Sequence, residues 1–280
     1  MHKYLGSSVA LVALLAGLGF AGTDKAAAQD GAGTTPPPKV VELITENLKV
    51  GQEGAPHYKT ESAFPRAFAA AQWPQHYFAM DALSGRARTV FFVAYDSFEA
   101  MQKDIEATEK NTTLSEALES AKSADAALLD SYETSTYVFR DDLSLRAPVK
   151  IESMRYFDIT IFNVRPGHRH DWDTLSKMYA SAYEKTPDAH WATFEKVYGT
   201  QSGSRYIVIT PMKSLAEVDQ EMTDDKQLRS TTGEDERKKR EELSAATIES
   251  SESHVYKINP KLSYPPDAWV KADPAFWGQK

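Results

Sequence analysis

One sequence pattern occurs twice in this chain, and this repetition constrains the fold more than any other feature. The run Asn47–Gly51 (Asn-Leu-Lys-Val-Gly) recurs 116 residues later as Asn163–Gly167 (Asn-Val-Arg-Pro-Gly). Further matches follow at offsets of 117 to 119 residues: Ser84-Gly85 with Ser202-Gly203, Ser97-Phe98 with Ser214-Leu215, and Tyr137–Ser144 with Tyr256–Ser263. A nearly fixed offset over several elements indicates two copies of one folding unit. The repetition predicts the architecture but does not identify the chemistry.

The first 28 residues have the features of a secretory signal peptide. Lys3 supplies a positive start, Val9–Phe20 is an apolar run broken only by Gly, and Ala26-Ala27-Ala28 is a small-residue cleavage site. A membrane helix is the alternative, but the apolar run is too short to cross about 30 Å of hydrocarbon. We expect cleavage after Ala28 and a bacterial periplasmic or secreted protein without a membrane span.

The composition excludes several classes of function. The chain has no Cys, which rules out disulfides, thiolate metal sites and iron–sulfur clusters. Its net charge is −8, and removal of residues 1–28 makes it −9, which argues against nucleic acid as a partner. Sequence signatures of dinucleotide-binding, Walker, nucleophile-elbow and zinc-protease sites are missing.

Each copy is expected to begin with a strand, a helix and a hairpin. The first strands, Val40–Val50 and Met154–Val164, are rich in β-formers and end at a Gly turn. The helix of the second copy carries an apolar stripe with steps of three and four residues: Trp172, Leu175, Met178, Tyr179, Ala182 and Tyr183. Its counterpart, with Tyr58, Phe64 and Phe68, is less regular because Pro65 kinks it or delays its start. The hairpin strands are His76–Ala82 with Ala87–Ala94, and His190–Tyr198 with Arg205–Thr210.

Two helices and a strand complete each copy. Ser97 and Ser214 are the expected N-caps of the first of these helices, which should bury Phe98, Met101 and Ile105 in one copy and Leu215 and Val218 in the other. An extra helix is marked by Leu114, Leu118, Ala121 and Leu128, and its counterpart contains the charged, solvated run Glu234–Glu242. The closing strands are Glu133–Arg140 and Ser253–Asn259. The order β-α-β-β-α-β is that of a ferredoxin-like unit.

The domain plan follows from these elements. Residues 1–28 are the signal peptide, 29–39 a flexible linker, 40–146 the first repeat, 147–153 a second linker, 154–263 the second repeat and 264–280 a tail. The tail contains Pro265, Pro266, Trp269, Phe276 and Trp277, which are expected to fasten it across the domain surface; binding of a partner is the alternative.

Two such units, with Val164-Arg165-Pro166-Gly167 leading into the helix of Trp172, resemble the dimeric α+β barrel superfamily. The antibiotic-biosynthesis-monooxygenase-like and NIPSNAP-like domains are the most similar subfamilies. The resemblance covers residues 40–146 and 154–263 and implies an α+β fold in which two tandem ferredoxin-like units pack sheet to sheet as an intrachain pseudo-dimeric barrel. One sheet with helices on a single side leaves its other face bare, and the second sheet covers that face. A monomeric pseudo-dimer or a homo-oligomer of it is expected.

The resemblance implies several activities, among them cofactor-free oxygenation, haem degradation, chlorite dismutation with haem, and ligand binding without a reaction. Relatives that degrade haem use an Asn on the first strand, a Trp and a His on a helix. Asn47 and Asn163 lie on the first strands here, but no His falls at the matching point of a long helix.

Four residues are candidates for catalysis. His76 and His190 precede an aromatic residue at the start of equivalent strands, where imidazole could act as a base or as a haem ligand. Arg88 and Arg205 occupy equivalent places on the next strand and could bind an anion. The simpler alternatives are half-buried strand ends for the two histidines and ion pairs with neighbouring carboxylates for the two arginines.

The candidate ligand-binding residues are aromatic: Tyr58, Tyr77, Trp172, Tyr179, Tyr183 and Trp191. The resemblance implies a cavity between the first helix and the sheet, so these residues are either core or cavity lining. His168 and His170 lack further metal ligands nearby, and they are interpreted, like His57, as surface residues at a helix start. No metal site is predicted.

Three functions are compatible with these patterns, and whether the protein is an enzyme is left open. The first is a small-molecule-binding or scaffold protein with a small, largely apolar ligand and no cofactor. The second is a cofactor-independent monooxygenase-like enzyme that acts on an aromatic substrate, with His76 or His190 as base. The third is a haem-binding protein that uses one of these histidines.

Overall fold

The computed structural model describes residues 34–200 and 203–279. The expected signal peptide, and Ser202 of the repeated Ser-Gly pair, lie outside the described residues. The first repeat consists of β1 (Val40–Leu48), α1 (Ala55–Glu61), α2 (Ala63–Ala70), β2 (Tyr77–Ala82), β3 (Arg88–Tyr95), α3 (Phe98–Lys110), α4 (Thr112–Asp125) and β4 (Leu129–Phe139). The second consists of β5 (Tyr156–Val164), α5 (Arg169–Tyr183), β6 (Ala192–Tyr198), β7 (Ser204–Met212), α6 (Ala216–Thr231), α7 (Glu234–Thr247) and β8 (Ile248–Tyr264). Short 3-10 turns at Asp141–Leu143 and Ile151–Ser153 connect the repeats, and α8 (Asp267–Ala272) and α9 (Pro274–Trp277) end the chain.

The strands form one closed barrel in the order β1-β3-β2-β8-β5-β7-β6-β4. The two repeats have the same internal register, because Asn47 lies opposite Arg88 and Asn163 lies opposite Arg205. The repeats meet at two seams, where β2 pairs with β8 and β4 pairs with β6. Both seams are antiparallel, so closure leaves neither repeat with an open sheet edge. The predicted tandem pseudo-dimeric barrel is confirmed.

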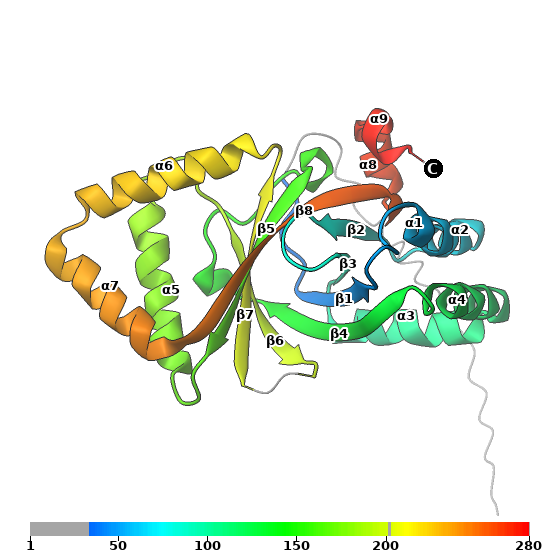
Figure 1. Ribbon diagram of the computed structural model, residues 1–280, viewed down its shortest axis with the longest axis horizontal. Helices are drawn as coiled ribbons and strands as arrows, with labels where there is room; N and C mark the ends of the chain where they lie inside the picture. Colours follow the sequence, from blue (N-terminus) through cyan, green and yellow to red (C-terminus); the bar gives the residue numbers. More distant parts are fainter. Residues whose placement is uncertain (1–33, 201–202, 280) are drawn as a thin grey trace, which may run out of the picture. The chain divides into compact units, whose positions relative to one another are not determined.

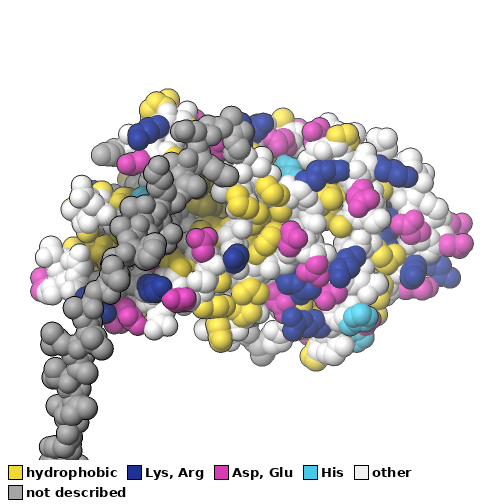
Figure 2. Space-filling model, turned by 180° about the vertical axis from the view of Figure 1, so that it is seen from behind, with side chains coloured by type: hydrophobic (Ala, Val, Ile, Leu, Met, Phe, Trp, Pro, Cys, Tyr) yellow, Lys and Arg dark blue, Asp and Glu magenta, His cyan; other side chains and the backbone are white. Residues whose placement is uncertain are grey.

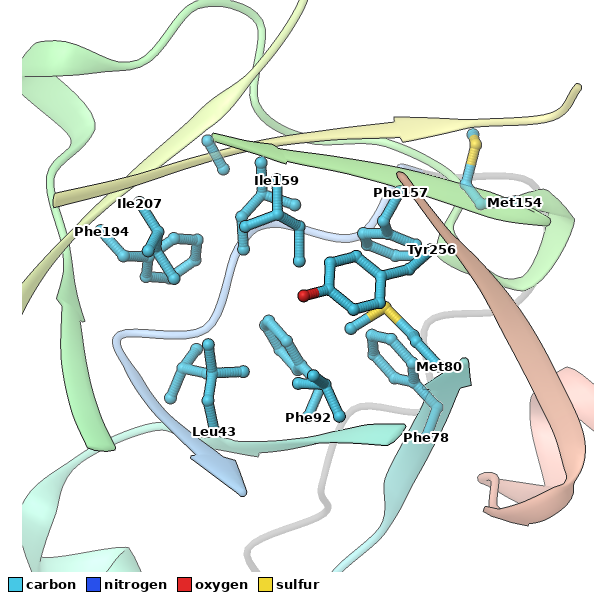
Figure 3. Close-up of a cluster of buried hydrophobic side chains, with 14 of the residues drawn as sticks. Leu43, Phe78, Met80, Phe92, Met154, Phe157, Ile159, Phe194, Ile207 and Tyr256 are labelled. Carbon is cyan, nitrogen blue, oxygen red and sulfur yellow. The ribbon is translucent and has the colours of Figure 1, made fainter. Parts of the chain in front are cut away.

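The barrel interior is a core to which both repeats contribute (Figure 3). Side chains of alternating residues point inward from each strand, since successive residues of a strand face opposite sides of the sheet. Aromatic rings meet across the two halves, with centroids 5.3 Å apart for Phe78 and Phe157 and 6.4 Å apart for Phe92 and Phe194. Figure 3 shows side chains from opposite walls pointing toward one another. Apolar side chains of both repeats thus occupy much of the barrel interior.

The C-terminal tail packs on the barrel, in agreement with the expected fastening. Trp277 is 3% exposed and belongs to the same apolar cluster as the barrel interior, with Trp269 and Phe276 packed against it. The Trp277 indole N–H donates to the Glu152 carbonyl over 2.8 Å, and the Arg155 guanidinium lies 3.9 Å from the centroid of the Phe276 ring. Near the other end of the described chain, Thr35 pairs with Val149, so the expected flexible linker is held at this point.

The helices cover the outer face of the barrel, α1 to α4 over the first repeat and α5 to α7 over the second (Figure 1). The irregular first helix is divided at Ser62 into α1 and α2, with Pro65 in the first turn of α2, where the backbone N–H needs no intrahelical acceptor. Ser97 caps α3 as predicted, since its hydroxyl accepts from the Ala100 N–H over 3.1 Å. Within the described part of the chain, no helix combines the length and apolar character that crossing a bilayer requires.

Three local predictions were wrong. Phe98 and Ile105 of α3 are 44% and 47% exposed, because only Met101 of the expected stripe packs on the sheet. Leu215 is likewise 44% exposed, and it, not Ser214, occupies the N-cap position of α6. The closing strand β8 is far longer than expected, because its first part pairs with β5 and its second part pairs with β2.

Acidic and basic side chains are interspersed over the face shown in Figure 2.

Candidate functional site

A cavity of about 670 Å³ lies in the second repeat between the outer face of β5, β6 and β7 and the helices α5, α6 and α7. Successive side chains of β5 point to opposite faces of the sheet. Phe157 and Ile159 therefore point into the barrel core, while Asp158, Thr160 and Phe162 line the cavity. The volume is in the usual range for a site that holds a small organic molecule.

Aromatic side chains form much of the cavity wall. The residues concerned are Phe162, Trp172, Tyr179, Tyr183 and Trp191. Trp172 is 4% exposed and fixed between two rings, 4.9 Å from Phe162 and 4.9 Å from Tyr206. Tyr183 and Trp191 meet edge to face at 5.8 Å. The stripe of α5 thus lines the cavity along its length, with a buried residue at Trp172 and a more exposed one at Tyr179, which is 40% exposed.

The polar lining of the cavity is acidic. Six carboxylate residues contribute to it: Asp158, Asp188, Glu217, Glu221, Asp224 and Asp225. Among the described lining residues there is no Lys or Arg. Some of these carboxylates have partners elsewhere, as Asp225 does in Arg229 and Glu217 does in the backbone N–H of Lys213. The cavity nevertheless has an excess of negative charge.

Two of these carboxyl groups influence each other across the cavity. Burial raises the pKa of Glu221 to about 7; repulsion from Asp158, Glu217 and Asp224 acts in the same direction, whereas the neighbouring His190 lowers it. Burial also raises the pKa of Asp158. Both carboxyl groups lack a Lys or Arg ion pair among the described residues, so a positively charged ligand would relieve their repulsion.

Helix α6 covers the cavity and is seated loosely. None of its described residues is buried, and Met222 is 68% exposed although it lines the cavity. Both Leu215 and Val218 were predicted to face inward. Val218 lines the cavity, whereas Leu215 does not. Little burial of its side chains indicates a low free energy for local opening of this helix.

His190 lies at this cavity, but both ring nitrogens are engaged by the main chain. Nδ1 lies 2.8 Å from the Asp188 carbonyl oxygen and Nε2 lies 2.8 Å from the Pro211 carbonyl oxygen. These contacts hold the ring at the start of β6. Each ring nitrogen therefore points at a main-chain oxygen and not into the cavity.

The remaining predicted residues of the first repeat lie away from this cavity. The His76 ring lies 4.7 Å from the Tyr264 ring, and burial lowers the pKa of His76. Tyr77 is enclosed by aromatic rings, among them Phe68 at 5.7 Å. The Tyr58 hydroxyl donates to Asp81 over 2.8 Å. Of the six predicted ligand-binding residues, the structure brings four to the large cavity: Trp172, Tyr179, Tyr183 and Trp191.

The two candidate arginines occupy equivalent places at the barrel seams. The Arg205 Nε donates to the Asn163 side chain over 2.9 Å, and Arg205 lowers the pKa of Tyr137, which burial raises. Arg88 acts on Tyr256 in the same way, with its guanidinium carbon 5.4 Å from the ring centroid. Each arginine therefore faces a tyrosine of the other repeat. Both arginines thus contact the other repeat, and neither of them lines the large cavity.

The two repeats differ in the side chains at the positions that line the large cavity, and those of the first repeat are larger. Register places Phe91 of β3 at the position of Val208 of β7, and Ile44 of β1 at the position of Thr160 of β5. Phe91 is 5% exposed and packs with Tyr77, while Trp73, Leu114 and Leu118 form a further cluster between α2 and α4.

The charged network around Arg140 was not predicted. Its guanidinium binds Asp142, Asp173 and Glu195 at 2.9, 3.1 and 2.8 Å. Arg169 adds a further ion pair to Glu195 at 2.7 Å. The network connects the end of β4 in one repeat with α5 and β6 of the other, beside the turn that follows β4. The only sequence signal is an Arg at the end of a predicted strand, which does not identify its partners.

Comparison with known proteins identifies relatives by structure alone. No family model matches the sequence, and no curated protein does either. A solved structure of an anthrone oxidase-like protein matches with a TM-score of 0.53 at 14% identity, covering 81% of this chain and 93% of that one. A protein provisionally assigned as a monooxygenase from Fusobacterium nucleatum matches with a TM-score of 0.51 at 8% identity, covering 79% and 93%. A haem-binding protein from Thermus thermophilus matches with a TM-score of 0.44 at 13% identity, covering 88% and 98%. The chain thus shares the fold of the first two of these structures, in which strands and covering helices form an α+β barrel.

Proposed function

We propose that the second repeat binds a small aromatic molecule that carries a positive charge. The observation that carries this proposal is the lining of the large cavity, which combines five aromatic residues and six carboxylates with no described Lys or Arg. Aromatic faces attract cations and apolar rings alike. Carboxylates that have no cationic partner gain from a ligand that supplies one.

The position of the charges supports this ligand class. Asp158 on the sheet and Glu221 on the covering helix approach the cavity from opposite sides, and the charge of Asp158 raises the electrostatic cost of ionising Glu221. A cation between the two carboxylates would remove their repulsion and would hold α6 against the sheet. Ligand binding would then close the cavity at the same time.

Haem fits this lining poorly. Its propionates are anionic and would meet six carboxylates with no described basic residue in the cavity to receive them. The one histidine of the described lining, His190, has both nitrogens occupied by carbonyl oxygens. The same contacts argue against His190 as the base of an oxygenase, so the geometry favours binding over catalysis.

The proposal is tested by titration with two fluorescent probes of opposite charge. Thioflavin T is aromatic and cationic, whereas anilinonaphthalenesulfonate is aromatic and anionic. We expect one thioflavin T molecule to bind per chain, and to bind more tightly than the anionic probe. Glu221→Gln should weaken the cationic probe about 10-fold, the order expected for a charged contact in a partly buried site. Glu99→Gln, on the exposed first turn of α3, is the control and should change nothing.

Two results would contradict the proposal. Equal affinity for the two probes would show that the carboxylates do not select charge. Retained affinity in the Glu221→Gln variant would place the probe outside the cavity.

We also infer that the protein is exported, on the basis of the first 28 residues. Fractionation of the producing cells and N-terminal sequencing test this: a mature chain that starts at Gln29 is expected, and an uncut cytoplasmic chain would contradict it.

A further inference from the structure

A second group of functional side chains lies in the first repeat, on elements that do not border the large cavity. Glu46, His57, Glu61 and Asp125 each direct one potential ligand atom to a common point, and these four atoms lie within 4.8 Å of one another. Their residues are 5%, 0%, 3% and 1% exposed. The prediction that His57 is a surface residue at a helix start is wrong, because α4 and the sheet enclose it.

The local structure explains why these residues meet. His57 and Glu61 are four residues apart on α1 and therefore lie on the same face of the helix. Glu46 is on the outer face of β1, since Leu43 on the opposite face points into the barrel core. Asp125 is the last residue of α4. Three separate elements thus converge on one buried point.

The charges at this point are not balanced by the protein. His57 Nε2 lies 3.1 Å from Glu46 Oε2 and 3.8 Å from Asp125 Oδ1, and these are the ion pairs that the described structure gives the cluster. No Lys or Arg of the described chain pairs with these carboxylates. Three carboxylates therefore share a single imidazole.

Glu61 provides an independent indication of a missing ligand. Within the described part of the chain its carboxylate makes no hydrogen bond and no ion pair, and its buried Oε2 has no partner. Asp125 Oδ2 is also buried without a partner among the described residues. Buried carboxylates in proteins are paired or coordinate a metal, because an isolated buried charge costs several kcal/mol or more.

We propose that Glu46, His57, Glu61 and Asp125 bind one divalent transition-metal ion. Three oxygen ligands and one imidazole nitrogen suit Mn²⁺, Fe²⁺ or Zn²⁺. His57 Nε2 lies 3.1 Å from Glu46 Oε2 and 3.8 Å from Asp125 Oδ1, and ligand atoms at about 2.0–2.2 Å from a zinc ion lie roughly 3–4 Å from one another. The Thr60 hydroxyl donates to Asp125 Oδ1 over 2.5 Å, which orients this carboxylate as outer groups do in metal sites.

A second cavity of about 240 Å³ borders the cluster at His57, and Tyr58, Asp81 and Arg88 also line it. The proposal concerns this repeat alone and does not depend on the ligand of the large cavity.

The test uses the untagged protein, freed of metal by a chelator and titrated with Zn²⁺, Mn²⁺, Fe²⁺ under anaerobic conditions, and Co²⁺ as a spectroscopic probe. We expect one ion per chain by calorimetry and elemental analysis, a rise in melting temperature, and a visible d–d band that saturates at one equivalent of Co²⁺. Glu61→Gln should lower the affinity at least ~100-fold, more than the loss of an outer-shell group. Glu42→Gln is the matched control, because Glu42 is a half-buried carboxylate on the same strand and lies outside the cluster.

The melting temperatures distinguish a metal ligand from a residue that only supports the fold. Without metal, Glu61→Gln should be as stable as the parent protein or more stable, since it removes an unpaired buried carboxyl group. With metal, only the parent protein and Glu42→Gln should become more stable. Failure of all four ions to bind stoichiometrically would overturn the proposal, as would unchanged affinity in Glu61→Gln.

Discussion

Exchanging one pair of equivalent residues tests whether the two repeats differ in the way the structure indicates. Val208 and Phe91 occupy the same register position in the two repeats. Val208 lines a cavity of about 670 Å³, whereas Phe91 is 5% exposed and packs with Tyr77. The substitutions Val208→Phe and Phe91→Val each give one repeat the side chain of the other.

The two substitutions should have very different effects on stability. Phe91→Val removes most of a buried ring while the neighbouring side chains hold their places, and Phe-to-Ala changes in cores cost about 3–5 kcal/mol. Since Val retains two methyl groups, we expect a loss of about 2–3 kcal/mol. Val208→Phe adds a ring where space exists, so it should avoid the overpacking cost of about 1–3 kcal/mol and change stability by less than about 1 kcal/mol.

Urea unfolding monitored by circular dichroism measures both free energies, and the thioflavin T titration measures the effect on the cavity. Val208→Phe should abolish or strongly weaken probe binding at unchanged stability, while Phe91→Val should bind the probe normally. Equal destabilisation by the two variants would refute the reasoning, because it would show that the space beside Val208 is filled in solution.

Three further predictions concern charge and the tail. The pKa of Glu221 is about 7 in the folded chain against 4.5 ordinarily, so the folded chain keeps this carboxyl group protonated at pH values where the unfolded chain has lost the proton. The free energy of unfolding should therefore fall as the pH rises from about 4.5 to about 7. Glu221→Gln should remove this pH dependence in thermal unfolding, and an unchanged pH dependence would exclude Glu221 as its source. Arg140→Met should lower the free energy of unfolding by about 3 kcal/mol, because Glu195 is 8% exposed and loses one of its two arginine partners. Arg86→Met removes one partner of an exposed ion pair and should lower it by less than about 1 kcal/mol in the same urea assay. Trp277→Ala should cost about 3–5 kcal/mol, and a loss below about 1 kcal/mol would mean that the tail does not complete the core.

The repeat made the architecture predictable from the sequence. Matching residues such as Asn47 and Asn163 required two copies of one unit, and the observed registers opposite Arg88 and Arg205 agree. The same signal could not show how the copies differ, because Phe91 and Val208 are both ordinary strand residues. Only the surrounding packing decides that one fills its repeat and the other borders a cavity.

The two candidate sites were less predictable from the sequence, because each joins residues from elements far apart in the chain. The apolar stripe of α5 pointed to Trp172, Tyr179 and Tyr183, and the structure brings them to the cavity. Several of the carboxylates opposite them come from a helix whose exposed, polar sequence resembles any solvated helix. The cluster around His57 joins residues from Glu46 to Asp125, and nothing in their spacing along the chain indicates that α1 and α4 meet over β1.

A crystal structure of the protein with a bound cationic aromatic compound tests the central claim most directly. We predict electron density for the compound between the outer face of β5 to β7 and helices α5 and α6, with its charged group near Asp158 and Glu221. Density inside the barrel or in the first repeat, or a second repeat whose side chains close the cavity completely, would contradict the account.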